Sequence, residues 1–124
     1  MINIGNIDKN KLGKYKNRII TEIVILTDER KQHIYENHQK DFDLIISNLL
    51  KVILEPDEIL DDYKNTDTIL VIGSLEKDNL NIIIKLNTTN SKTHPQNSIM
   101  TAWLIRDKNL QKLREKHKTI YKRA

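Results

Sequence analysis

Two segments with a strong strand pattern, residues 81–88 and 98–105, flank a polar loop over residues 89–97. Both segments are rich in β-branched side chains, which favour strands, and each is long enough to cross a small domain. The loop is longer than a simple hairpin requires, and such loops often carry functional residues. We therefore expect the two segments to lie at the centre of a sheet, with a functional loop at one end.

Polar residues interrupt both segments in alternation with apolar ones. Successive side chains on a strand point to opposite faces, so Ile84 faces the core and Lys85 faces away from it. By the same rule Thr101 points outward beside Ile99 and Trp103. The pattern predicts that Lys85, Thr101 and Trp103 share the sheet face that the first two helices leave open.

Helical periodicity is clearest over residues 41–54, where apolar residues recur at spacings of three and four. Pro56 ends this helix, because the residue before a proline avoids helical dihedrals. An earlier helix is predicted from Thr27, whose hydroxyl caps it, to about His38. A short basic helix is predicted over residues 107–117.

Three further strand-like runs are residues 18–26, 57–63 and 68–75, and short polar links favour antiparallel hairpins. The predicted fold class is α+β: a strand, two helices, then a mostly antiparallel four-stranded sheet and a C-terminal helix. Residues 1–17 are rich in Asn, Lys and Gly and are expected to be a flexible lead-in or linker. Residues 18–124 are then a single domain.

Charge changes this picture because it is unevenly distributed along the 124 residues. The net charge is +4, but residues 1–18 carry +4, residues 19–105 carry −6 and residues 106–124 carry +6. Basic ends match a phosphate-backbone ligand, although a Lys-rich surface also serves solubility alone. The chain has no cysteine, which excludes thiol catalysis and fits a reducing compartment such as the cytoplasm, and no apolar run approaches a membrane span.

The histidines are the candidate acid–base residues. Arg30, His33 and Asn37 fall on one stripe of the first predicted helix, and His38 lies at its end. Imidazole exchanges protons near neutral pH, so His33 or His38 can act as a general acid or base. Their five-residue spacing does not match the four-residue step of a paired zinc site, and we expect neither a metal nor a cofactor.

Glycine-rich phosphate loops and nucleophile elbows are absent, since the only glycines are Gly5, Gly13 and Gly73. Kinase, dehydrogenase and most NTPase functions therefore lose support. A basic domain with His, Lys and Thr on an open face instead fits metal-independent RNA cleavage, in which the 2′-hydroxyl attacks the adjacent phosphorus. DNA lacks that hydroxyl and would be spared.

Five segments, in order along the chain, carry a resemblance to a known family. They are residues 26–38 (LTDERKQHIYENH), 55–59 (EPDEI), 83–86 (IIKL), 97–103 (NSIMTAW) and 118–123 (KTIYKR). Together they resemble the phage-associated nuclease domains of the barnase–EndoU–colicin–RelE class, known as the BECR fold. The resemblance implies a toxin-type endoribonuclease that acts on RNA, such as tRNA, in the cytosol of a producer or target cell. It also implies an immunity protein or antitoxin as a partner.

Matched position by position, the resemblance assigns three catalytic roles. His33 would be the general acid or base, Lys85 would stabilise the phosphorane, and Thr101 would orient the scissile phosphate. Contacts to phosphate or base are implied for a second set: Arg30, His38, Asn97, Ser98 and Tyr121. His38 stands where many related domains carry a second histidine, so His33 and His38 remain alternatives for the proton transfer.

Two alternatives to an enzyme stay open. A non-catalytic module could bind RNA or a protein through the basic ends and Trp103, or the chain could be a structural component of a phage. Asp57, Glu58, Asp61 and Asp62 would repel RNA if they bordered the site, and are expected at the solvated edge of the sheet or at a partner surface. Incubation with RNA in chelator separates an enzyme, which gives discrete products, from a binder, which does not.

Overall fold

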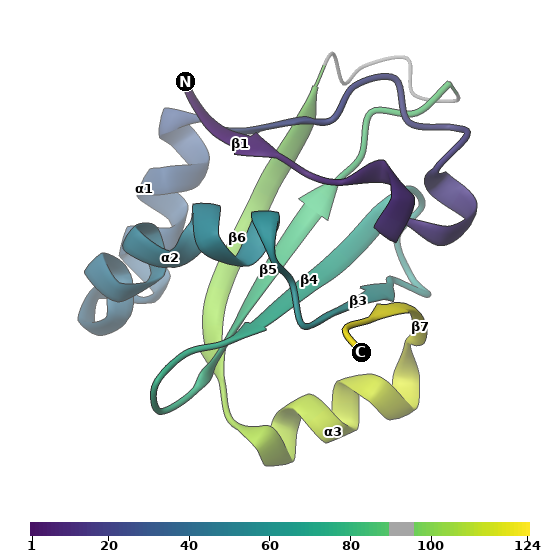
Figure 1. Ribbon diagram of the computed structural model, residues 1–124. Coiled ribbons are helices and arrows are strands. Elements are labelled where there is room, and N and C mark those ends of the chain that lie inside the picture. Colours follow the sequence, from purple (N-terminus) through teal and green to yellow (C-terminus); the bar gives the residue numbers. More distant parts are fainter. Residues whose placement is uncertain (90–95) are drawn as a thin grey trace.

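The computed structural model describes residues 1–89 and 96–124 and has one mixed sheet with helices packed around it (Figure 1). The order of strands across the sheet is β1-β2-β6-β5-β4-β3-β7. The strands are β1 (Ile2–Asn6), β2 (Ile23–Leu26), β3 (Glu58–Asp61), β4 (Thr68–Ser74), β5 (Asn79–Lys85), β6 (Asn97–Ile105) and β7 (Lys118–Lys122). The helices are α1 (Asp28–Asn37), α2 (Phe42–Leu54) and α3 (Asp107–Lys116), with short 3-10 turns at Lys9–Lys11, Gly13–Tyr15 and Gln39–Asp41.

The helices begin and end where local chemistry directs them. The Thr27 hydroxyl accepts a hydrogen bond of 3.1 Å from the backbone N–H of Arg30, which caps α1. α2 ends at Leu54, two residues before Pro56. None of the helices in the described ranges is long and apolar enough to cross a membrane.

The main core lies between α2 and one face of the sheet, with Ile34 of α1 packed into it. Helix α2 approaches β4 so closely at Gly73 that a Cβ there would lie 2.7 Å from a Val52 methyl group. Any larger residue at this position would force Val52 or the helix to shift. Glycine therefore sets the distance between α2 and the sheet.

The prediction of a four-stranded, mostly antiparallel sheet is wrong, because the sheet has seven strands and is mixed. β2 pairs parallel with the start of β6, at Asn97 and Ser98, while the other pairs are antiparallel. The edge strands β1 and β7 were not predicted, since β1 alternates over only Ile2 and Ile4 and β7 has its two apolar residues, Ile120 and Tyr121, adjacent in sequence. Their pairing depends instead on neighbours distant in sequence.

Residues 1–17, for which composition indicated a flexible lead-in, are packed onto the domain. β1 pairs antiparallel with β2, and Ile7, Leu12 and Tyr15 are buried. The Tyr15 hydroxyl donates a 2.7 Å hydrogen bond to Asp61. Burial, and then this contact with the Asp61 carboxylate, raise the pKa of the Tyr15 phenol above its ordinary value. The folded unit thus includes the N-terminal segment.

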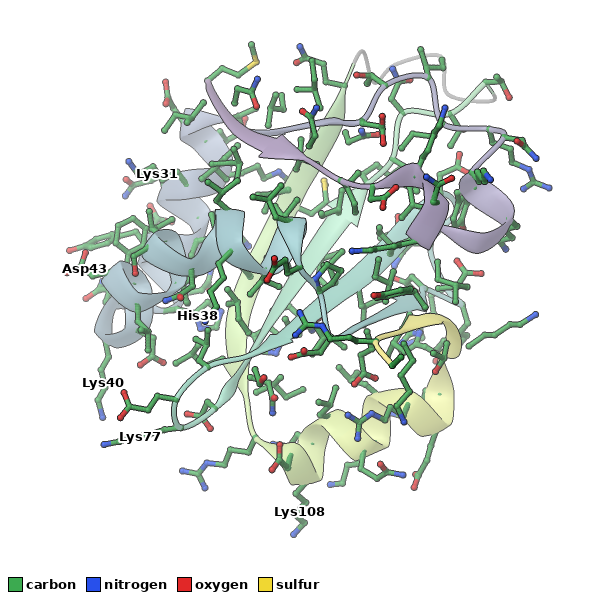
Figure 2. All side chains as sticks on the ribbon, viewed as in Figure 1. Lys31, His38, Lys40, Asp43, Lys77 and Lys108 are labelled. Carbon is green, nitrogen blue, oxygen red and sulfur yellow. The ribbon has the colours of Figure 1, made fainter. Side chains whose placement is uncertain are left out.

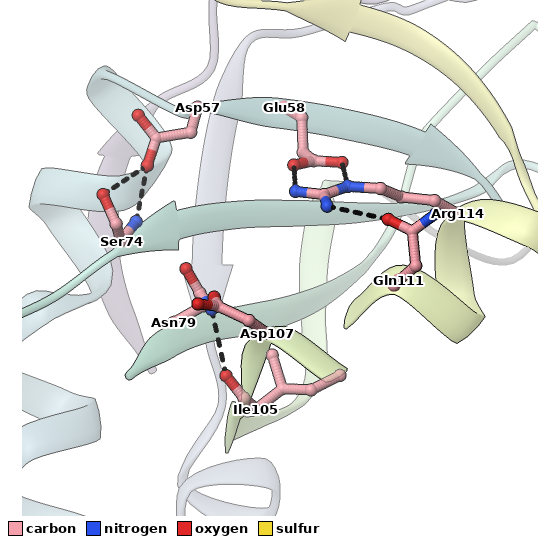
Figure 3. A network of polar contacts seen from close by, with 8 residues as sticks. All are labelled: Asp57, Glu58, Ser74, Asn79, Ile105, Asp107, Gln111 and Arg114. Atoms are coloured by element: carbon pink, nitrogen blue, oxygen red, sulfur yellow. Dashed lines mark hydrogen bonds and ion pairs between the residues drawn. The ribbon is translucent and has the colours of Figure 1, made fainter. Parts of the chain in front are cut away.

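The second face of the sheet is covered in part by α3. Leu110 and Leu113 pack with a smaller apolar cluster that includes Ile72, Trp103 and Ile105. Figure 3 shows two polar attachments of this helix: Arg114 pairs with Glu58 of β3, and Asn79 of β5 contacts Asp107 at the helix start. The rest of this face is open to solvent at a groove.

Candidate functional site

A hollow of about 360 Å³ lies on the second face of the sheet beside α3, and we call it the open-face groove. Strand side chains form its floor, the β3–β4 loop forms one rim, and the end of α3 forms the other. The lining residues are Leu70, Ile83, Thr101 and Trp103 from strands, Asp62, Tyr63, Lys64 and Asn65 from the loop, and Leu113, Lys116 and His117 from the helix end.

The floor of the groove is set by strand register. Leu70 pairs with Ile83, and Ile83 pairs with Thr101, so the three side chains form one row across β4, β5 and β6. Trp103 lies two residues beyond Thr101 on the same face. The Thr101 hydroxyl therefore sits on an apolar floor beside a large aromatic ring.

A β-bulge in β6 alters the predicted alternation. The register shifts between Ile83 and Ile84, so that Ile84 pairs with Ile99 and Met100 is the extra residue. Ile99 is consequently buried in the main core, not outward beside Thr101 as alternation predicted. The outward direction of Thr101 is unaffected.

Asp62, on the loop rim of the groove, is an ionised carboxylate that accepts hydrogen bonds from its own loop. Burial opposes ionisation of Asp62, but hydrogen bonds from the Asn65 side chain and from the backbone N–H groups of Lys64 and Asn65 outweigh it and lower the pKa of Asp62. These bonds occupy both carboxylate oxygens. Asp62 therefore shapes the loop, and part of its negative charge is compensated by the backbone.

His117 is held at the opposite rim by Tyr63. The two rings lie 5.0 Å apart, and the Tyr63 backbone N–H donates to His117 Nδ1 at 3.3 Å. A donor at Nδ1 requires a lone pair there, so the proton of the neutral ring is on Nε2. Nε2 can then donate a hydrogen bond to an anionic ligand.

His38 lies on the other side of Trp103. The rings are stacked with centroids 6.5 Å apart and an interplanar angle of 24°. Figure 2 shows His38 between the ends of α1 and α2 and the strands. Within the described part of the chain neither of its ring nitrogens has a hydrogen-bond partner, and the residue is half-buried. Its nitrogens are available for proton transfer.

His33 and Arg30, predicted for the site, line a separate hollow on the outer surface of α1, with Glu29 and Glu36. His33 is exposed, and the Asn37 amide nitrogen lies 3.3 Å from its Nδ1. The two histidines of α1 therefore have different surroundings: His38 reaches the Trp103 ring, and His33 faces solvent beside acidic residues.

Lys85 and Ser98 pair with each other across β5 and β6, on the same face as Thr101 but outside the lining of the groove. The Lys85 ammonium donates to the Thr66 backbone carbonyl in the β3–β4 loop. The expected meeting of His33, Lys85 and Thr101 in one pocket is thus not seen. Of the three, Thr101 alone lines the open-face groove.

Asn97 and Tyr121, both predicted to contact substrate, make contacts within the fold and lie outside the groove. Asn97 is fully buried, donates to the carbonyls of Thr21 at 2.7 Å and Ile23 at 2.9 Å, and accepts from the Asn87 N–H at 2.8 Å. Tyr121 lies on the edge strand β7, with the Lys11 ammonium 5.3 Å from its ring. Neither lines the groove.

The residues that sequence reasoning missed are Tyr63, Lys64, Lys116 and His117. The basic C-terminal segment and the polar 64–67 link were visible signals, but only the packing of α3 brings them to the same hollow. Across residues 1–89 and 96–124 no group of three or more His, Asp or Glu side chains is placed to hold a metal ion. His94 lies outside the described residues.

Comparisons with protein-family models, with curated proteins and with solved structures find no match to this chain. The functional assignment therefore rests on the groove and its chemistry.

Proposed function

We propose that the open-face groove binds single-stranded RNA and cleaves it without a metal ion. The supporting observation is that Thr101 shares one hollow with two exposed or half-exposed aromatic rings, Trp103 and Tyr63, and with two lysines, Lys64 and Lys116. Aromatic rings stack on bases whatever their sequence, and lysines hold the phosphate backbone. Hydroxyl and imidazole groups beside them supply the chemistry of phosphoryl transfer.

The reaction is an internal transfer at phosphorus. The 2′-hydroxyl loses its proton to a base and forms a bond to the adjacent phosphorus, while the bond from phosphorus to the 5′-oxygen breaks. The 5′-oxygen takes up a proton, so the products are a 2′,3′-cyclic phosphate and a free 5′-hydroxyl. No oxidant, reductant or second substrate is required.

Each group has a role that fits its surroundings. His38 stacks on Trp103 just outside the groove lining, has no hydrogen-bond partner for its ring nitrogens among the described residues, and is the proton-transfer group in this proposal. Thr101 and the Nε2–H of His117 donate hydrogen bonds to the phosphate oxygens, which gain negative charge in the transition state. Lys64 and Lys116 add positive charge at the two rims. This assignment favours His38 over His33, which lies in another hollow.

A test of the function uses the whole chain with labelled RNA of mixed sequence and with tRNA, in excess chelator. We expect discrete products whose upstream fragments end in a cyclic phosphate, and no cleavage of DNA of the same sequence. Intact RNA with a shifted mobility would instead support a non-catalytic RNA-binding module. That alternative draws support from His117, whose Nδ1 is occupied by a backbone N–H and suits binding better than proton transfer.

An RNA-cleaving domain would act in the cytosol, where its substrate is. A producing cell would then need an immunity protein or antitoxin to neutralise it. Growth arrest on expression, relieved by a Thr101→Val variant, would support this toxin-type role. Unimpaired growth with full-length, folded protein would favour a structural role in a phage.

A further inference from the structure

Asn81, at the middle of β5, is a buried amide without a hydrogen-bond partner. Its side chain is 0% exposed, and neither Nδ2 nor Oδ1 has a partner within the described ranges. A buried amide loses its hydrogen bonds to water and normally regains them from protein. The neighbouring Asn79 shows the usual outcome, since its amide donates to Asp107 at 2.8 Å and to the Ile105 carbonyl at 3.2 Å.

The surroundings of Asn81 are apolar. It pairs with Ile72 on β4 and with Trp103 on β6, and both belong to the cluster that packs under Leu110 of α3. A Leu or Val would suit this place better than an amide, because each unmet hydrogen bond weakens the fold. Local packing therefore gives no reason for an asparagine here.

The open-face groove lies immediately beside this amide. The row Ile72, Asn81 and Trp103 is the next row along the strands from Leu70, Ile83 and Thr101, which form the groove floor. Side chains two residues apart on one strand face are about 7 Å from each other. Trp103 is the strand partner of Asn81 and also lines the groove, so its ring lies between the groove and the amide.

We propose that Asn81 is a specificity-determining residue that binds the edge of one RNA base in the open-face groove. The inference rests on the proposed RNA binding, but not on cleavage. A base stacked on the Trp103 ring places its edge toward the row that holds Asn81. The amide offers a donor beside an acceptor, the pattern that reads base edges in pairs of hydrogen bonds. Binding then satisfies both unpartnered atoms.

Asn81 is closed off in the free protein, so access requires displacement of neighbouring side chains, and Trp103 is the strand partner that also lines the groove. The Trp103 ring is partly exposed and packs against the smaller cluster under α3, so its displacement would leave the main core closed. Such a site would favour the correct base strongly, because a wrong base leaves the same buried amide unpartnered.

The test measures binding of four labelled 2′-O-methyl octamers: octa-adenylate, octa-cytidylate, octa-uridylate and octa-inosinate. The 2′-O-methyl group removes the attacking hydroxyl, so affinity is measured without cleavage. We expect the unmodified protein to prefer one octamer by about tenfold, the discrimination typical of one paired contact. Asn81→Leu and Asn81→Val should bind all four within about twofold of the weakest.

A control on the same strand is Ile82→Val, which changes the opposite face and should keep the wild-type ranking. Thermal melting of the Asn81 variants should be unchanged or higher, because an apolar side chain replaces an unsatisfied amide. A wild-type ranking that survives in both folded Asn81 variants overturns the inference. So does equal binding of all four octamers by the unmodified protein.

The two proposals can fail separately. Selective binding that depends on Asn81, with no cleavage of ordinary RNA, would keep this inference and overturn the nuclease proposal. Cleavage of RNA without any base preference would keep the nuclease proposal and overturn the role of Asn81. Absence of binding to every octamer and of cleavage would overturn both.

Discussion

Arg114 of α3 makes a two-pronged ion pair with Glu58 of β3, with Nε 2.9 Å from Oε1 and Nη2 2.6 Å from Oε2 (Figure 3). The Glu58 side chain is only 7% exposed, whereas Arg114 is 38% exposed. Hydrogen bonding to Glu58 raises the pKa of Arg114 further above its usual range, so the pair stays ionised. This contact fixes α3 over the second face of the sheet.

Replacing Arg114 alone should lower the free energy of unfolding more than replacing Arg114 and Glu58 together. Arg114→Met leaves a buried carboxylate without its partner and should lower the free energy of unfolding by about 2–3 kcal/mol. Arg114→Met combined with Glu58→Gln should recover part of that loss, because no charge remains buried. Urea denaturation of the four proteins in the cycle measures the coupling. A loss in the double variant equal to the sum of the two single-variant losses would show that the pair contributes no coupling free energy to the attachment of α3.

Tyr15 should make the stability of the protein fall at high pH. Because its pKa is raised by burial and by Asp61, the folded state keeps the phenol proton more tightly than the unfolded state, which releases it near pH 10. Stability from this group is therefore complete below about pH 10 and is lost as pH rises above it. Tyr15→Phe should lower the free energy of unfolding by about 1 kcal/mol at neutral pH. The stability of this variant should also decline less steeply than that of the unmodified protein above about pH 10. Parallel declines in the two proteins would contradict this assignment.

The helices could be predicted from sequence because their signals are local. Thr27 caps α1, Pro56 follows α2, and the apolar stripe of α2 faces the core. Edge strands β1 and β7 and the parallel pairing of β2 with β6 depend on contacts between distant segments. The apolar pattern of these short edge strands extends over two residues at most, so the four-stranded expectation failed there.

The site could be predicted only in part, for a similar reason. Alternation along β6 correctly placed Thr101 and Trp103 on the open face, but it could not reveal the bulge that turns Ile99 inward. Tyr63 and His117 come from a loop and a helix end 54 residues apart. Their neighbourhood is created by the path of the chain around the sheet, which residue spacing does not encode.

Asn97 should prove essential for stability and not for substrate binding. Asn97→Ala removes the hydrogen bonds to the carbonyls of Thr21 and Ile23 and the one from the Asn87 N–H. It should lower the free energy of unfolding by about 2–4 kcal/mol. Ser98→Ala is the matched control, since within the described residues its hydroxyl makes a single contact of 3.5 Å, and it should change the free energy of unfolding by less than about 0.5 kcal/mol. Urea denaturation gives both values. A folded Asn97→Ala protein of unchanged stability with weakened RNA affinity would restore the substrate-contact role.

His38 and His33 offer a paired test of the proposed active site, because both belong to the same short segment of chain. His38→Ala removes the imidazole stacked on Trp103 and should lower the rate of RNA cleavage by about 100-fold or more, the usual contribution of a general acid or base. His33→Ala removes an exposed ring in a separate hollow and should leave the rate within about twofold. Single-turnover cleavage of a labelled RNA measures the chemical step, and affinity for the 2′-O-methyl octamers shows whether binding is kept. A large loss from His33→Ala with none from His38→Ala would move proton transfer away from the Trp103 edge of the open-face groove to the outer surface of α1.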